Sequence, residues 1–157
     1  MLNELLKRYP CLESTSEDIV KAEKALITCF KNGNKLLICG SGGSCADCEH
    51  IVGELMKGFL SKRPLSEEQK AEMKANCPEI EEKYLSLLQR AVPAIALPSF
   101  TALNTAFCND VEPELVFAQC LMGLGKKDDI LLCISTSGNS KNVVAAALTA
   151  KALGIKT

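Results

Sequence analysis

The feature of this sequence that most constrains its fold is a short apolar run that leads directly into a glycine-rich loop. Leu36 to Cys39 shows no alternation of polar and apolar residues, which is typical of a strand buried on both faces of a parallel sheet. Residues 40–44 (Gly-Ser-Gly-Gly-Ser) then turn the chain into a helical pattern. Glycines allow backbone N–H groups to approach a ligand closely, and a helix N-terminus adds partial positive charge, so this loop suits an anion. Its spacing fits neither the dinucleotide fingerprint nor a Walker loop, so no nucleotide cofactor is expected, and a plain strand-to-helix connection is the alternative.

A second loop of the same kind follows the apolar run Ile130 to Ile134 and precedes another helical pattern. Hydroxyl residues cluster around its one glycine, namely Ser135, Thr136, Ser137 and Ser140. Ligands of open α/β sheets bind at the carboxyl ends of the strands, so this density of donors indicates a phosphate site. Capping of the following helix is the alternative, but it needs only one of these hydroxyls.

Together, and in this order, the two loops resemble those of the SIS (sugar isomerase) phosphosugar-binding domain, and within that family the phosphoheptose isomerase branch. The resemblance runs from about Leu26 to the last residue. It implies an α/β fold: an open parallel sheet with helices on both faces, in a flavodoxin-like three-layer α/β/α arrangement, preceded by N-terminal helices. It also implies that the protein binds a sugar phosphate and isomerises sedoheptulose 7-phosphate to D-glycero-D-manno-heptose 7-phosphate. The positions that match the substrate and phosphate site are Ser41, Gly42, Gly43, Ser44, Asn109, Asp110, Ser135, Thr136, Ser137 and Ser140.

His50 and Glu54 lie four residues apart in the helical pattern after the first loop, and therefore on one helix face. An imidazole and a carboxylate in this arrangement can bind a metal or move a proton between neighbouring carbons. On spacing alone, a surface ion pair is the commoner explanation. The resemblance implies instead that both are catalytic residues and zinc ligands, with Glu54 as the base. For Asn109 and Asp110, turn formation is the alternative to a place in the sugar site.

Composition narrows the class of protein. A chain of 157 residues with 47% apolar content is long enough to bury one core. Its net charge of −1 gives no electrostatic case for binding nucleic acid or an anionic membrane. The sequence has neither a membrane-length apolar stretch nor a signal segment at its start, so a cytoplasmic location is expected.

Nine cysteines in a chain without an export signal are not expected to form disulfides. Those in apolar runs are predicted to be small buried hydrophobic residues, namely Cys29, Cys39, Cys108, Cys120 and Cys133. Cys45 and Cys48 form a C-x-x-C pair, but a zinc ribbon would need a second pair, and the sequence has none.

The chain is predicted to comprise N-terminal helices over 1–34 and an SIS domain over 35–157, with a helical insertion at 61–92. Residues 14–17 and 66–69 have the form of capping boxes, and the insertion is expected to hold helices to Asn76 and over 79–90. The apolar stripe of the second helix would serve as a lid, as a subunit contact, or as the core of a solvated hairpin. Further elements are expected as strands at 93–97 and 130–134, helices at 101–107 and 141–153, and the opening of a strand at 155–157.

In the family that the chain resembles, two more parallel strands and a long C-terminal helix follow this point. That helix supplies a glutamine and a histidine that complete the zinc site, whereas His50 is the only histidine here. The resemblance therefore implies a C-terminally truncated member with an incomplete zinc site, expected to form homo-oligomers, in the family usually tetramers. Two other functions stay open: a phosphosugar sensor without catalysis, and a scaffold similar to the SIS proteins that associate with the bacterial replication initiator.

Overall fold

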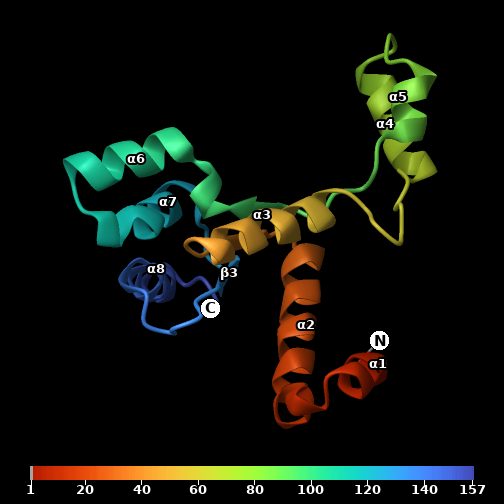
Figure 1. Cartoon of the computed structure of the whole chain (residues 1–157). Coiled ribbons are helices and arrows are strands. Elements are labelled where there is room, and N and C mark those ends of the chain that lie inside the picture. The colour runs from red at the N-terminus through yellow and green to blue at the C-terminus, as the bar shows by residue number, and fades with distance from the viewer. Residues whose placement is uncertain (1) are drawn as a thin grey trace.

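The computed structural model describes residues 2–157 (Figure 1). They include a three-stranded parallel sheet with the strand order β2-β1-β3. β1 (Leu36–Cys39) is the central strand, flanked by β2 (Ala94–Ala96) and β3 (Ile130–Cys133). All four residues of β1 are buried, because the strand has a neighbour on each side and helices on both faces. The continuous apolar run in the sequence therefore predicted the central strand correctly.

Helices cover both faces of the sheet, as predicted. Leu37 and Cys39 of β1 point into one core, which includes Leu121 and Ala146 from two helices on that face. Leu36 and Ile38 point the opposite way, into a core shared with the other pair of helices. The four covering helices are α7 (Val116–Leu124) and α8 (Lys141–Ala152) on the first face, and α2 (Ser16–Lys31) and α3 (Gly43–Met56) on the second.

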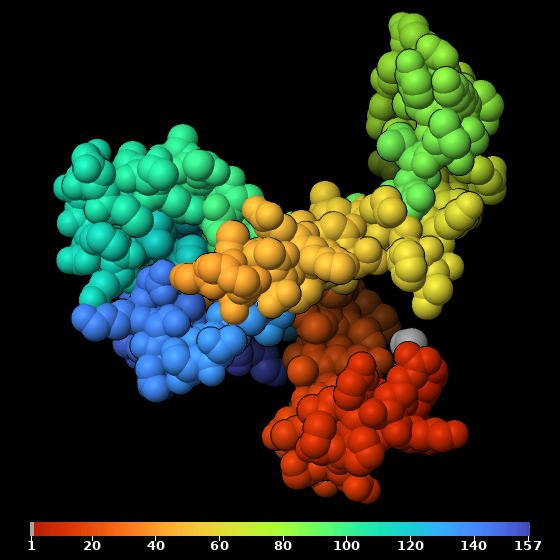
Figure 2. All heavy atoms as spheres, viewed as in Figure 1, coloured from red at the N-terminus to blue at the C-terminus, as the bar shows by residue number. Residues whose placement is uncertain are grey.

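Two parts of the chain project from this sheet region (Figures 1 and 2). One is the N-terminal part with α2, and the other is a helical hairpin that extends from the C-terminal end of α3. The remaining elements are α1 (Leu2–Arg8), η1 (Pro10–Thr15), α4 (Glu67–Asn76), α5 (Glu82–Leu87), η2 (Leu97–Ser99), α6 (Thr101–Asp110) and η3 (Pro113–Leu115).

The two predicted capping boxes have different outcomes. The box at 66–69 is confirmed: the Gln69 N–H donates to the Ser66 hydroxyl, and the Ser66 N–H donates to the Gln69 side chain. The box at 14–17 is wrong, because residues 10–15 form a 3-10 helix that continues directly into α2. Thr15 is consequently the N-cap residue of α2, and its side chain makes no capping hydrogen bond.

The helix predicted over 79–90 is shorter in the structure, where α5 ends at Leu87. Residues 88–90 are needed for the return to the sheet: Gln89 forms an antiparallel bridge with Pro64, and its side chain accepts a hydrogen bond from the Gly58 N–H. Leu87 is 67% exposed, so the apolar stripe of this hairpin lacks a covering partner within the described chain. Figure 1 shows the hairpin directed away from the start of α3, which excludes a lid over the first loop in this conformation.

Other differences are smaller. α6 extends three residues beyond the predicted end and includes Asn109 and Asp110, so these residues do not form a turn. Cys108 on the same helix is exposed and is not the buried residue that was predicted. At the C-terminal end, Lys156 forms a parallel bridge with Ile130, which confirms the predicted opening of a strand beside β3.

Candidate functional site

The first loop connects β1 to α3 and places a helix N-terminus at the carboxyl edge of the sheet. Gly42 has φ +62°, a conformation that favours glycine, and its carbonyl accepts the N–H groups of Cys45 and Ala46. α3 begins at Gly43, within the glycine-rich loop, so the first-turn N–H groups belong to the loop itself. This geometry suits an anion at the loop.

The absence of a side chain at Gly40 allows the two loops to lie close together. A Cβ atom at this position would lie 2.8 Å from Ser44 Cβ and 3.0 Å from the carbonyl oxygen of Ile134, which leads into the second loop. Ser44 is the second residue of α3 and is 8% exposed. The glycine therefore permits an approach between the ends of β1 and β3 that a side chain would prevent.

The second loop gathers its hydroxyls around Ser135. Ser135 Oγ lies 3.0 Å from Ser140 Oγ and 3.4 Å from Ser137 Oγ, and it accepts a hydrogen bond from the Gly138 N–H. Gly138 has φ +68°, which turns the chain back toward Ser135. Three of the four predicted hydroxyl residues are thus together, while no hydrogen bond of the Thr136 side chain is found in the part of the chain that the structure describes.

Helix capping does not account for this cluster. Ser140 is the N-cap residue of α8, but its side chain makes no hydrogen bond to the helix and faces Ser135 instead. The Val143 N–H of the first turn is instead satisfied by the Asn142 side chain. The hydroxyls bond to one another and to loop N–H groups, which leaves them able to reorient toward a ligand.

Asn142 joins the two loops and was not predicted from the sequence as a site residue. Its side-chain Nδ2 donates a hydrogen bond of 3.0 Å to the Ser41 hydroxyl in the first loop. The signal in the sequence was an asparagine in the first turn of a helix after a serine-rich loop, which reads as an ordinary helix start. Only the register of β1 against β3 brings Ser41 within its reach.

A cation also lies beside the second loop. Lys141 Nζ pairs with Glu114 of η3, and this hydrogen bond raises the pKa of Lys141. Asn109 and Asp110 are close to η3 in sequence, yet within residues 2–157 their side chains bond only to each other, with the Asn109 amide donating to the Asp110 carboxylate at 2.7 Å. Among the described residues, no side-chain hydrogen bond links the predicted Asn-Asp pair to either loop.

His50 and Glu54 lie one turn apart on α3, as predicted, with His50 Nε2 3.9 Å from Glu54 Oε1. Their side chains are 78% and 45% exposed. No hydrogen bond links either side chain to the two loops among the described residues. In this conformation the pair faces solvent and is separate from the hydroxyl cluster.

The pair fits part of a zinc site. An imidazole nitrogen and a carboxylate oxygen at this separation can approach one ion, but zinc in proteins normally has four ligands. Within residues 2–157 no group of three or more His, Cys, Asp and Glu side chains is placed to hold a metal. Further ligands of such an ion would be groups other than the described side chains, such as water or substrate.

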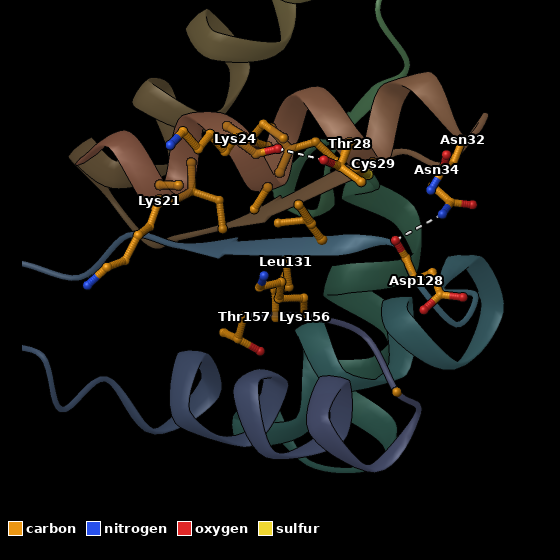
Figure 3. Close-up of a pocket in the computed structure, with 17 residues that line it drawn as sticks. Lys21, Lys24, Thr28, Cys29, Asn32, Asn34, Asp128, Leu131, Lys156 and Thr157 are labelled. Carbon is orange, nitrogen blue, oxygen red and sulfur yellow. Dashed lines mark hydrogen bonds between the residues drawn. The ribbon is translucent and has the colours of Figure 1, made fainter. Parts of the chain in front are cut away.

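A groove of the described chain lies away from both loops. It has a volume of about 870 Å³, runs between α2 and β3, and is lined mainly by apolar surface, with Lys21, Lys24 and Lys156 among its lining residues (Figure 3). At one end the Asn34 side chain donates to the Asp128 carbonyl oxygen (Figure 3). None of the predicted site residues lines it, so volume alone does not identify the ligand site.

Comparison with known proteins decides the family. The family model for the SIS domain matches residues 2–90 and 74–157 of the chain. The chain belongs to the SIS domain family. Similar curated proteins include the phosphoheptose isomerase of Aliarcobacter butzleri, 36% identical over 146 residues, and that of Shewanella pealeana, 37% identical over 134 residues. These matches cover 93% and 85% of this chain, but only 64% and 55% of the relatives, so the chain spans less than two thirds of their length.

Solved structures agree with this assignment. A phosphoheptose isomerase from Neisseria gonorrhoeae superimposes with a TM-score of 0.68 at 28% identity, covering 98% of this chain and 64% of that one. One from Francisella tularensis gives 0.69 at 29% identity, covering 99% and 72%. The predicted family and the α/β fold are thereby confirmed, and within the described residues no helix has the length and apolarity to cross a membrane.

Proposed function

We propose that this SIS chain binds a sugar phosphate between its two loops and has the isomerase chemistry of phosphoheptose isomerases, with sedoheptulose 7-phosphate as substrate. The observation that carries the proposal is the cluster of Ser135, Ser137 and Ser140, whose hydroxyls are not used in helix capping. Asn142 ties this cluster to the glycine loop of α3. Donors from two strand ends thus converge where an anion would sit.

The loops and the His50–Glu54 pair have different proposed roles. The loop hydroxyls and first-turn N–H groups would hold the phosphate, and Lys141 beside them would contribute positive charge. Glu54 is the proposed base for the proton that moves between C2 and C1, and His50 would hold that carboxylate in place. A zinc ion at His50 and Glu54, with ligands from outside this pair, would polarise the substrate's oxygen atoms.

The exposed position of His50 and Glu54 favours a second candidate, a phosphosugar sensor that binds without turnover. Both side chains are open to solvent in this conformation, and no hydrogen bond among the described residues joins them to the loops. The two functions differ in one measurement, because both require binding and only the isomerase converts its ligand.

Calorimetric titration of sedoheptulose 7-phosphate against sedoheptulose tests the binding step. We expect the phosphate form to bind at least about tenfold more tightly, since hydrogen bonds to a charged group contribute about 1.5–3 kcal/mol each. Ser135→Ala should weaken binding, whereas Ser86→Ala, in the projecting hairpin, should not. Equal affinities for the two sugars would refute the proposed site, and NMR analysis of the bound sugar separates isomerase from sensor.

We also propose that the chain self-associates, in accord with the tetramer expected for the family. Large apolar side chains of the hairpin region are open to solvent, with Phe59 73% and Leu60 93% exposed. Exposed apolar surface of this kind marks contact sites between chains. Light scattering at micromolar concentration should show an oligomer, and a stable monomer would contradict this part of the proposal.

A further inference from the structure

Two cysteines face each other at the carboxyl ends of neighbouring strands. Cys39 ends β1 and Cys133 ends β3, they are paired in the parallel register, and their sulfur atoms are 3.8 Å apart. Neighbouring strands lie about 4.8 Å apart, within the Cα separation that a disulfide accepts. We propose that Cys39 and Cys133 are a redox-modification site that forms a reversible disulfide with hydrogen peroxide and thereby weakens ligand binding at the loops.

The two thiols differ in access and in acidity. Cys133 is half-buried, whereas Cys39 is fully buried. The hydrogen bond from Cys39 lowers the pKa of Cys133, against the opposing effect of burial, while the same contact and burial raise the pKa of Cys39. Cys133 is consequently the sulfur that reacts with an oxidant, and Cys39 is the sulfur that resolves the product.

The reaction balances with peroxide as the only co-reactant. The Cys133 thiolate attacks one peroxide oxygen, the O–O bond breaks, and sulfenic acid and hydroxide form. Cys39 then attacks the Cys133 sulfur, the S–O bond breaks, and the departing hydroxide takes up the Cys39 proton as water. Two thiols and one peroxide thus give one disulfide and two waters, and a dithiol reductant reverses the change.

The bond would act on both loops, because Cys39 directly precedes the first loop and only Ile134 separates Cys133 from the second. The sulfur atoms must move from 3.8 Å to about 2.05 Å apart. The surroundings leave little room, since Gly40 already lies close to Ile134 and the Ile134 N–H donates to the Cys39 carbonyl at 2.9 Å. We expect a shift of the loops that lowers affinity for a sugar phosphate; this consequence rests on the proposed function, whereas the disulfide does not.

The competing thiols can be removed. Cys11, Cys77 and Cys108 are exposed and would form cross-links between molecules. A background in which these three are replaced by serine retains the Cys39–Cys133 contact, and Cys45 and Cys48 remain in it as an internal comparison. Adding Cys133→Ser to this background removes the reacting sulfur and changes a half-buried position only by one atom.

The experiment treats the background protein with hydrogen peroxide and maps its peptides without reduction. The expected result is a Cys39–Cys133 linked peptide, a loss of two hydrogen atoms in the intact mass, and full reversal by dithiothreitol. Cys133→Ser should abolish all three. The assignment would be overturned if Cys133 were found free or over-oxidised, or if Cys45 and Cys48 were linked in place of Cys39 and Cys133. If the serine background does not fold, the same peptide map of the unsubstituted protein decides between these results.

Titration of both redox forms with sedoheptulose 7-phosphate completes the test. We expect oxidation to weaken binding about tenfold, the effect of losing one good hydrogen bond to a charged group. Unchanged affinity in the mapped disulfide form would overturn the proposed effect on the loops. Absence of binding by the reduced protein would count against the proposed function, while the peptide map still decides whether the disulfide forms.

Discussion

The side chain of Asn142 donates a hydrogen bond of 3.0 Å to the hydroxyl of Ser41, 101 positions earlier in the sequence. This contact connects the loop after the central strand β1 to the first turn of α8, which follows the neighbouring strand β3. The two loops proposed to hold one phosphate are therefore joined before any ligand arrives. Such preorganisation reduces the entropy that binding must offset.

We predict that Asn142→Ala weakens binding of sedoheptulose 7-phosphate. Loss of one neutral hydrogen bond corresponds to about 0.5–1.5 kcal/mol, or about a two- to tenfold increase in Kd by calorimetry. The variant also loses the side chain that accepts the Val143 N–H, so its thermal stability should fall slightly. Asn76→Ala, at the end of α4, is the matched control and should leave Kd unchanged.

The close approach at Gly40 gives a prediction about stability. Gly40→Ala places a methyl group 2.8 Å from Ser44 Cβ and 3.0 Å from the Ile134 carbonyl oxygen, and one of these must move. We expect a loss of about 1–3 kcal/mol in the free energy of unfolding, measured with urea.

Gly53→Ala is the control for this substitution. Gly53 lies within α3, and a Cβ atom there meets nothing within 4 Å. Since alanine is the better helix former, this variant should gain about 0.5–1 kcal/mol. A Gly40→Ala protein as stable as the wild type would show that the two loops are not closely packed.

The buried carboxylate of Asp129 predicts a dependence of stability on pH. Burial opposes its charge, but hydrogen bonds from Lys35 and the Lys126 N–H outweigh this, and the pKa of Asp129 is lowered. Because the folded-state pKa lies below that of the unfolded chain, its stabilisation is complete above the unfolded value and is lost as pH falls through the folded one. Stability should therefore decline on acidification below about pH 5.

Asp129→Asn should remove this part of the acid dependence and leave the Lys35 ammonium, which is 20% exposed, without its partner. We expect about 3 kcal/mol lower stability at neutral pH and a flatter profile in acid, by urea unfolding at several pH values. Asp128→Asn is the control, because asparagine tolerates the positive φ at that position and the Asp128 carbonyl contact with Asn34 is retained. Parallel acid profiles for wild type and Asp129→Asn would contradict the argument.

The features that could be predicted from the sequence are those determined by local residue patterns. Residues close in sequence were sufficient to predict the central strand, the glycine loop and the capping box at Ser66. The C-terminal end of the helix expected at 79–90 could not be predicted in this way. Gln89 pairs with Pro64 and accepts a hydrogen bond from Gly58, and these tertiary contacts end the helix before the apolar pattern does. Asn142 was missed for the same reason: its partner Ser41 is adjacent only after the strands have paired.

The last prediction concerns His50 and Glu54 as the protein part of a metal site. Nε2 of His50 and Oε1 of Glu54 are 3.9 Å apart on one exposed face of α3, so both can reach one zinc ion while water fills the other positions. Because two protein ligands are too few for tight binding, we expect weak affinity that falls at low pH, where the imidazole must lose a proton to bind. Calorimetry with zinc should show His50→Ala and Glu54→Gln each reducing affinity at least about tenfold, the size expected when a ligand or its immediate support is removed. Glu72→Gln on the projecting hairpin is the matched control and should bind zinc as the wild type does. Identical zinc affinities in all four proteins would show that His50 and Glu54 form only a surface contact and hold no metal.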